Sequence, residues 1–419
     1  MRDRHNQYRH LSCRSSRALF TMLRPMVGIM NRSLVFIVLV FALTPAIVAG
    51  ADSDSEVITP LILNVADAPI AFQGSDGRSH LVYELWITNF SSAEAALEKV
   101  DVLGDGSIIQ SFDSAEIAGR LQPAGLRQSS GVLAKSTQAL LFVHIILARG
   151  AAVPVQLSHR VSARVDAAPP GHQEVVETGG PVTVDRRPVI RIGPPLQGEG
   201  YVSADSCCDA TRHTRAALPV NGRVWIAQRF AVDWEQLDKD HRIYSGPREK
   251  PESYTIFGKA AIAVSDATVA SVTDGLPEQT PGKFPTDISP DAADGNAVIL
   301  DLGDHRYCMY AHMQPGSIRV RARDKVHRGQ VLGLVGNSGN SIAPHLHFQV
   351  MDSPSSLASN GLPYEIDNFQ VTGKTPGTEA FDEAEAKGAP LTIVPQAGQA
   401  VHNALPLDQL VIAFPSIAQ

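Results

Sequence analysis

Two histidines separated by one residue, His345 and His347, are the reactive side chains that stand out in the sequence. They lie in residues 344–350, where polar and apolar residues alternate, and this pattern predicts a β-strand. Side chains at positions i and i+2 of a strand point to the same face, so both imidazoles project from one face. Two imidazoles on a rigid face suit a metal site, or a metal site with an adjacent base.

Two further strand-like runs deliver other candidate ligands or bases. One run, residues 310–312, ends at His312, and the other, residues 230–233, ends at Asp233. An isolated His-x-His is more often a pair of surface histidines on a half-buried strand. Three apolar runs that each carry a possible ligand favour a shared site instead.

The elements that position these residues are predicted to be strands in an all-β chain with two domains. Residues 55–192 contain short strand-like runs separated by turn signals, a pattern typical of an immunoglobulin-like β-sandwich. A second β-rich domain is predicted for residues 193–373. Residues 374–419 are rich in Ala, Glu, Pro and Gln, which predicts a loosely ordered tail.

A targeting segment is predicted near the N-terminus. Residues 30–51 combine a basic start, an apolar run and small residues at 49–51, which together indicate a secretory signal peptide. The apolar run over 34–43 is short for a membrane span, although an uncleaved anchor is the alternative. Because Met30 would start a signal peptide of ordinary length, residues 1–29 are predicted to be disordered or to precede the true start codon. We therefore expect a periplasmic or extracellular protein with no other membrane segment.

The composition is that of a globular protein, with 44% hydrophobic and 19% charged residues in a chain of 419. A net charge of −7 argues against nucleic acid as a partner, because no basic surface is supplied. The chain has only four cysteines, so a disulfide framework is excluded. The adjacent Cys207 and Cys208 can form a vicinal disulfide or, less readily, join a metal site. The scattered His80 and His144 are predicted to be structural, and the oligomeric state is left open.

Over residues 230–352 the sequence resembles the lysostaphin-type (LytM-like, β-lytic) zinc metalloendopeptidases, which cut peptide cross-links in bacterial cell walls. The order of the matching pieces carries the resemblance, since no single piece is specific. The pieces are residues 230–233, 265–275, 295–296, 310–312, 316–317, 329–330, 336–339 and 345–347, with 361–364 beyond them. The resemblance implies an antiparallel β-sheet or flattened barrel (a duplicated hybrid motif) for residues 193–373. It also implies a substrate cleft walled by the loops 235–253, 276–294 and 336–344.

The resemblance further implies roles for the site residues. In the family, zinc lies between a His-x-x-x-Asp pair and the second histidine of His-x-His, which makes Asp233 and His347 zinc ligands here. His312 and His345 match the two histidines that orient the attacking water and carry its proton. The implied function is that of a secreted zinc metalloendopeptidase acting on peptidoglycan peptides or another peptide substrate.

One position departs from the family pattern. Arg229 stands four residues before Asp233, where the motif has histidine. A guanidinium cannot ligate a metal, because it stays protonated and offers no lone pair. Either the site has lost its zinc, or a third ligand comes from elsewhere in the chain. We expect Arg229, together with Asn296 and Asn337, to contact the substrate, and a salt-bridged surface arginine is the alternative for Arg229.

His213 is the candidate third ligand, because a hairpin can carry it to the vacated position. Two strand-like runs flank residues 220–222. With a three-residue loop there, His213 faces Arg229 across the hairpin and shares the face of Asp233. With a two-residue turn, His213 would instead pair with Phe230 and point away. We prefer the three-residue loop, and with it His213 as a zinc ligand.

Two other functions are compatible with the sequence. A lysostaphin-type domain that has lost a ligand can bind the wall or regulate another wall hydrolase without catalysis. The N-terminal sandwich can also bind carbohydrate or protein and dominate the function. The enzyme is favoured, because every other residue of the site persists.

Overall fold

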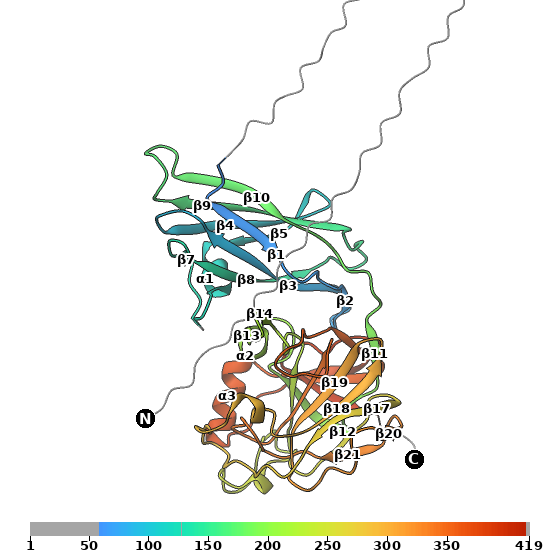
Figure 1. The fold of residues 1–419 in the computed structure, drawn as a ribbon. Helices are drawn as coiled ribbons and strands as arrows, with labels where there is room; N and C mark the ends of the chain where they lie inside the picture. Colours follow the sequence, from blue (N-terminus) through green and yellow to red (C-terminus); the bar gives the residue numbers. More distant parts are fainter. Residues whose placement is uncertain (1–57, 127, 416–419) are drawn as a thin grey trace, which may run out of the picture. The chain divides into compact units, whose positions relative to one another are not determined.

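The computed structural model describes residues 58–126 and 128–415 (Figure 1). The predicted signal segment and the sequence before it lie outside these described residues. The described chain is mostly β-strand, as the strand-like runs predict. No helix within the described ranges is long and apolar enough to cross a membrane.

The N-terminal domain consists of two five-stranded sheets whose strands pair antiparallel. Side chains of both sheets meet in one buried core, which includes Leu85, Val100 and Val161. The first sheet contains β1 (Leu61–Val65), β2 (Phe72–Gln73), β3 (Ser79–Asn89), β6 (Leu121–Pro123) and β8 (Gln138–Ile146). The second contains β4 (Ala95–Gly104), β5 (Ser107–Asp113), β7 (Val132–Leu133), β9 (Gln156–Val165) and β10 (Glu174–Thr183). A short helix, α1 (Ser114–Arg120), follows β5. The arrangement is that of a sandwich, and its immunoglobulin-like type stays a prediction.

The second domain is built on a ten-stranded sheet, with strands in the order β20-β17-β18-β19-β22-β15-β12-β26-β24-β25. The inner strands β19, β22 and β15 carry His312, His347 and Asp233, respectively. Seven strands of the large sheet have the bounds β12 (Gly198–Ala204), β15 (Val232–Gln236), β17 (Ala267–Thr273), β18 (Asn296–Gly303), β19 (Arg306–Met313), β20 (Lys325–Val326) and β22 (Leu346–Met351). Smaller pairs are β11 (Ile190–Ile192) with β23 (Tyr364–Ile366), β13 (Leu218–Val220) with β14 (Arg223–Trp225), and β16 (Ala260–Ile262) with β21 (Val331–Leu334).

The C-terminal part of the chain is ordered, so the prediction of a loose tail over 374–419 was wrong for its described residues. These form the end of β24 (Phe369–Lys374), then α3 (Thr378–Lys387), β25 (Val394–Val401) and β26 (Leu410–Phe414). The strand β26 is hydrogen-bonded between β12 and β24 within the large sheet. Composition averaged over the whole segment gave the wrong prediction, because it hides a short apolar run such as β26, which forms a buried strand.

A chain of polar contacts, here called the histidine chain, joins the sandwich to the second domain. His80 on β3 contacts Asp76 through Nε2 (3.0 Å) and His144 on β8 through Nδ1 (2.9 Å). His144 Nδ1 in turn lies 2.9 Å from an oxygen of Asp209. The sulfur of Cys208 lies close by, and it is bonded to Cys207 in the vicinal disulfide considered from the sequence.

Candidate metal centre and its pocket

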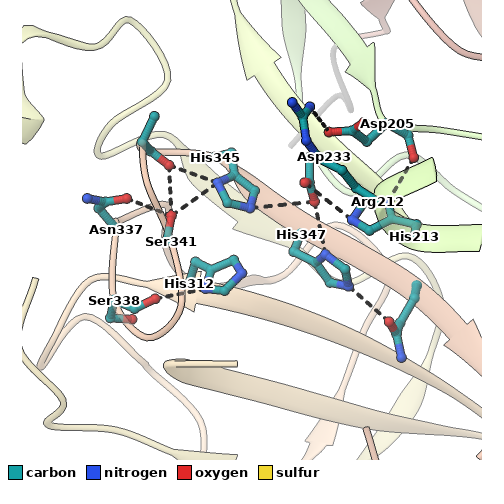
Figure 2. A network of polar contacts seen from close by, with 12 residues as sticks. Asp205, Arg212, His213, Asp233, His312, Asn337, Ser338, Ser341, His345 and His347 are labelled. Atoms are coloured by element: carbon teal, nitrogen blue, oxygen red, sulfur yellow. Dashed lines mark hydrogen bonds and ion pairs between the residues drawn. The ribbon is translucent and has the colours of Figure 1, made fainter. Parts of the chain in front are cut away.

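Pairing of β15 with β22 brings Asp233 and His347 together. The two residues are direct cross-strand partners in the antiparallel register, so their side chains share one face of the sheet. The Nδ1 atom of His347 lies 2.9 Å from Oδ1 of Asp233 (Figure 2). The alternating pattern that predicted a strand around His347 therefore corresponds to β22.

His213 reaches the same carboxylate from a short helical turn, α2 (Thr211–Thr214), after β12. Its Nε2 atom lies 3.3 Å from Oδ2 of Asp233, and Figure 2 shows the ring directed at that carboxylate. Ligand atoms of His213, Asp233 and His347 all lie within 4.8 Å of one another. These three residues, which we call the candidate metal centre, include the ligand predicted to replace the motif histidine.

The route by which His213 arrives differs from the predicted one. The β13–β14 hairpin pairs Val220 with Arg223, so its loop is the two-residue turn Asn221-Gly222, and the preference for a three-residue loop was wrong. Both turn residues have positive φ, 52° and 79°, which an Asn-Gly turn accommodates readily. The hairpin ends at Leu218, so its register does not fix the position of His213.

The outer nitrogens of both imidazoles are tied to protein acceptors. His213 Nδ1–H donates to the backbone oxygen of Asp205 (2.7 Å), and His347 Nε2–H donates to Oε1 of Gln349 (2.9 Å). The Gln349 amide is itself oriented by Met351, whose sulfur lies 3.3 Å from its nitrogen. These bonds leave lone pairs on His213 Nε2 and His347 Nδ1 that face a carboxylate. Such a contact calls for a cation, which can be a proton or a metal ion.

Sequence reasoning missed Asp205 and Gln349, which orient these rings. Gln349 had a signal, because it lies two residues after His347 on the same strand face. Asp205 had none, because its hydrogen bond to His213 is made by the backbone carbonyl.

The charges within the centre stabilise one another. Burial would raise the pKa of Asp233, but His213 and His345 outweigh this effect and hold the pKa well below its ordinary value. Burial would lower the pKa of His213, but Asp233 and Asp205 outweigh it and raise the pKa to about 9. The centre therefore stabilises a carboxylate beside positive charge.

His345 and His312 lie next to the centre, as predicted. His345 directly precedes β22, with Nδ1 2.8 Å from the backbone oxygen of Ala343 and Nε2 3.5 Å from Asp233. His312, on β19, lies 2.8 Å through Nδ1 from the backbone oxygen of Ser338. The two ring centroids are 4.6 Å apart. Burial, helped by the nearby imidazoles, lowers the pKa of His312 well below its ordinary value and keeps the ring neutral.

Arg229 does not reach the pocket, so its predicted contact with substrate was wrong. Its guanidinium binds the Glu84 carboxylate of β3 through two nitrogens, at 2.9 and 2.7 Å, and both side chains are buried. The alternative of a salt-bridged arginine holds, although the pair is internal rather than on the surface. The partner lies in the other domain, which no local pattern indicates.

Asn296 and Asn337 are buried behind the pocket, so substrate contact through their side chains was also wrong. The Asn296 amide donates to the backbone oxygens of Leu276 (2.8 Å) and Met313 (3.0 Å). The Asn337 amide donates to Gln279 O at 3.0 Å, and its oxygen accepts from the Ser341 hydroxyl at 2.6 Å. Both side chains hold loops in place.

A pocket of about 530 Å³ opens over the centre, and all three predicted loops contribute to its walls. Arg248 of loop 235–253, Phe284 of loop 276–294 and Ile342 of loop 336–344 line the pocket. The helix α3 forms a wall that the sequence did not predict. From it come Phe381, Asp382, Glu385 and Ala386.

Comparison with known proteins identifies the central part of the second domain. Residues 258–359 match the model of Peptidase family M23, a range that includes His312, His345 and His347 but not Asp233 or His213. Endolysin 2638A of Staphylococcus phage 2638A is 42% identical over 89 residues, 18% of this chain and 18% of that protein. Peptidoglycan DD-endopeptidase ShyA of Vibrio cholerae is 39% identical over 57 residues, 14% of this chain and 13% of that protein. The chain thus spans less than a fifth of the length of these two curated relatives.

Solved structures include a similar protein. The catalytic domain of the antimicrobial peptidase lysostaphin from Staphylococcus simulans aligns with 39% of this chain and 86% of its own, with 22% identity and a TM-score of 0.21. The sequence motifs and the family match together show that residues 258–359 belong to a lysostaphin-type domain of peptidase family M23.

Proposed function

We propose that the protein is a zinc metalloendopeptidase that hydrolyses peptide bonds in peptidoglycan peptides. One observation carries the proposal: two imidazole nitrogens and a carboxylate, from His213, His347 and Asp233, converge at the wall of a pocket. The M23 match and the names of the matched relatives, an endolysin and a peptidoglycan endopeptidase, support this reaction and substrate class.

The three residues of the candidate metal centre fit zinc. Catalytic zinc takes three nitrogen or oxygen ligands from the protein and keeps a further position open. The hydrogen bonds to Asp205 and Gln349 fix the tautomers that leave His213 Nε2 and His347 Nδ1 free to bind it. Zinc held there would polarise the scissile carbonyl and lower the pKa of a coordinated water.

His345 and His312 are the proposed proton carriers. Each donates its Nδ1–H to a backbone oxygen, so Nε2 carries the lone pair, and that of His345 lies 3.5 Å from the Asp233 carboxylate. The lowered pKa of His312 keeps that acceptor neutral. A neutral imidazole beside the centre can accept the proton of the attacking water and return one to the leaving amine.

A wall-binding or regulatory module without catalysis is the second candidate. It is favoured by Arg229, which stands at the position of a motif histidine. Against it, Arg229 is occupied by Glu84, and His213 supplies a nitrogen in its place.

We also infer a periplasmic or extracellular location. Residues 30–51 have the pattern of a signal peptide, and the Cys207–Cys208 disulfide suits an oxidising compartment. For the N-terminal domain we propose an immunoglobulin-like sandwich that positions the peptidase domain or binds the wall.

Metal analysis combined with wall digestion tests the enzyme. We expect about one zinc per chain and release of peptide ends from purified peptidoglycan. His213→Ala and His347→Ala should lose both zinc and hydrolysis, whereas His327→Ala, which changes an exposed histidine, should keep both. Wild-type protein that binds the wall without zinc and without hydrolysis would support the regulatory module instead.

A further inference from the structure

We propose that the pocket contains a subsite for an alkylammonium group, formed by Glu235 and Glu385, which takes a peptide residue whose aliphatic side chain ends in a primary amine. The inference rests on the proposed peptidase function and assigns a substrate class to it.

Glu235 carries the first part of the argument. It lies two residues after Asp233 on β15, so it shares the face of the candidate metal centre at a backbone spacing of about 7 Å. Only 7% of Glu235 is exposed, and its Oε2 has no hydrogen-bond partner among the described residues. Buried carboxylate oxygens normally accept a hydrogen bond. Because the Glu235 side chain lines the pocket, a bound ligand can supply the donor that the protein does not.

The charge balance of the pocket indicates what that donor is. Five carboxyl groups but only two guanidiniums line the pocket, so acidic side chains outnumber guanidiniums there. A bound cation would pair with the acidic groups that no guanidinium contacts. The carboxylates are Asp205, Asp233, Glu235, Asp382 and Glu385, and the guanidiniums are Arg212 and Arg248.

The existing ion pairs show which carboxylates are free. Arg212 is taken by Asp205 (2.7 Å) and Asp382 (2.5 Å), and Asp233 faces the histidines. Within the described part of the chain, Glu235 and Glu385 have no ion pair. Burial raises the pKa of Glu385 to about 7, and Arg248 only partly opposes this effect. Glu235 and Glu385 are therefore the two carboxyl groups of the pocket that can pair with a bound cation.

Apolar side chains complete the subsite. Phe381 on α3 is buried, while Phe284 and Ile342 are exposed at the pocket. Methylene groups can pack on these side chains while the terminal ammonium reaches the glutamates. A metal ion would not use this apolar lining, and a short polar cation would leave it uncovered. The lining therefore favours an amine on an aliphatic stem.

The test compares two synthetic peptides on the zinc-loaded full chain. They differ only in whether the side-chain amine of one residue is free or acetylated, so the stem is kept and the charge is removed. We expect at least a tenfold higher kcat/KM for the free amine, mainly through KM. Glu235→Gln and Glu385→Gln should each bring this ratio close to one. Glu383→Gln, an exposed residue on the same helix, should leave it unchanged.

A binding measurement separates this inference from the proposed function. Calorimetric titration of both peptides into wild type and Glu235→Gln reads the subsite even if neither peptide is cut. Equal affinity of wild type for the two peptides, or a preference that survives in both glutamine variants, would overturn the subsite. Absence of cleavage with a retained preference for the amine would instead overturn the peptidase assignment alone.

Discussion

The candidate metal centre and the histidine chain contain similar residues but aim them differently. In the centre, His213 Nε2 and His347 Nδ1 both face the Asp233 carboxylate, because their other nitrogens donate to Asp205 and Gln349. In the histidine chain, the two imidazoles face each other instead. Both groups border a cavity, of about 530 Å³ and 660 Å³, so access does not distinguish them.

The distances in the histidine chain suit a shared proton. His80 Nδ1 and His144 Nε2 are 2.9 Å apart, whereas two nitrogens on one tetrahedral zinc lie about 3.3 Å apart. Three hydrogen bonds run along the chain from Asp76 to Asp209, and two neutral imidazoles supply two protons. Three hydrogen bonds along the chain would require one proton more than these two rings supply. Burial lowers the pKa of His80 and opposes this charge, while Asp76 favours it.

The comparison shows that residue types alone do not define a metal site. The bonds made by the outer nitrogens decide whether lone pairs converge on one point or meet in a hydrogen bond. Cys208 is a second example. Its sulfur lies close enough to His80 and His144 to bind a metal with them, but it is bonded to Cys207 in a disulfide instead.

The largest expected effect comes from breaking an outer contact of the centre. Gln349→Leu removes the acceptor of His347 Nε2–H, so the ring loses its fixed tautomer. We expect zinc affinity to fall by about 10- to 100-fold, measured by competition with a chelator. Gln349→Glu keeps an acceptor and should retain most of the affinity. Unchanged affinity in the leucine variant would show that the outer bond does not prepare the ligand.

An intermediate effect is expected from the histidine chain. His144→Ala leaves His80 and Asp209 without their shared partner, so we expect a loss of about 2 kcal/mol in the free energy of unfolding. Denaturant titration measures this loss. Zinc content should stay at the wild-type level. A variant that is fully folded but holds less zinc would show that the histidine chain also contributes to zinc binding.

The smallest effect concerns pH. Burial would raise the pKa of Asp209, but His144 and Arg120 outweigh it and hold the pKa below its ordinary value. A lowered carboxyl pKa stabilises the folded state above about pH 3.9, and the stabilisation is lost as the pH falls further. Because 51% of the Asp209 side chain is exposed, we expect less than about 1 kcal/mol. The stability difference between wild type and Asp209→Asn should shrink between pH 5 and 3. A stability difference that grows on acidification would contradict the prediction that ionised Asp209 stabilises the folded state.

Sequence patterns predicted those parts of the site that depend on local geometry. Alternation over 344–350 predicted the strand β22, which carries His347 and begins one residue after His345, and the resemblance located Asp233 and His312. His213 was identified through a hairpin register that the structure does not have, because Asn221 accepts the positive φ of a two-residue turn. The structure places His213 beside Asp233, although the geometric reason for expecting it there was wrong, and its role as a zinc ligand stays a prediction.

The remaining errors involve long-range contacts. Glu84 lies 145 residues before Arg229, so nothing near Arg229 indicated a buried ion pair. Glu385 and the wall formed by α3 come from a segment whose composition suggested a loose tail. Such contacts depend on tertiary packing, which neither periodicity nor composition encodes.

The Arg229–Glu84 pair has an evolutionary consequence. Histidine at position 229 would leave the buried Glu84 carboxylate without its guanidinium, at a cost of several kcal/mol. On the proposed assignment, loss of His213 alone would remove a metal donor. We therefore expect Arg229 to change only together with Glu84, and His213 only together with a residue that replaces its nitrogen.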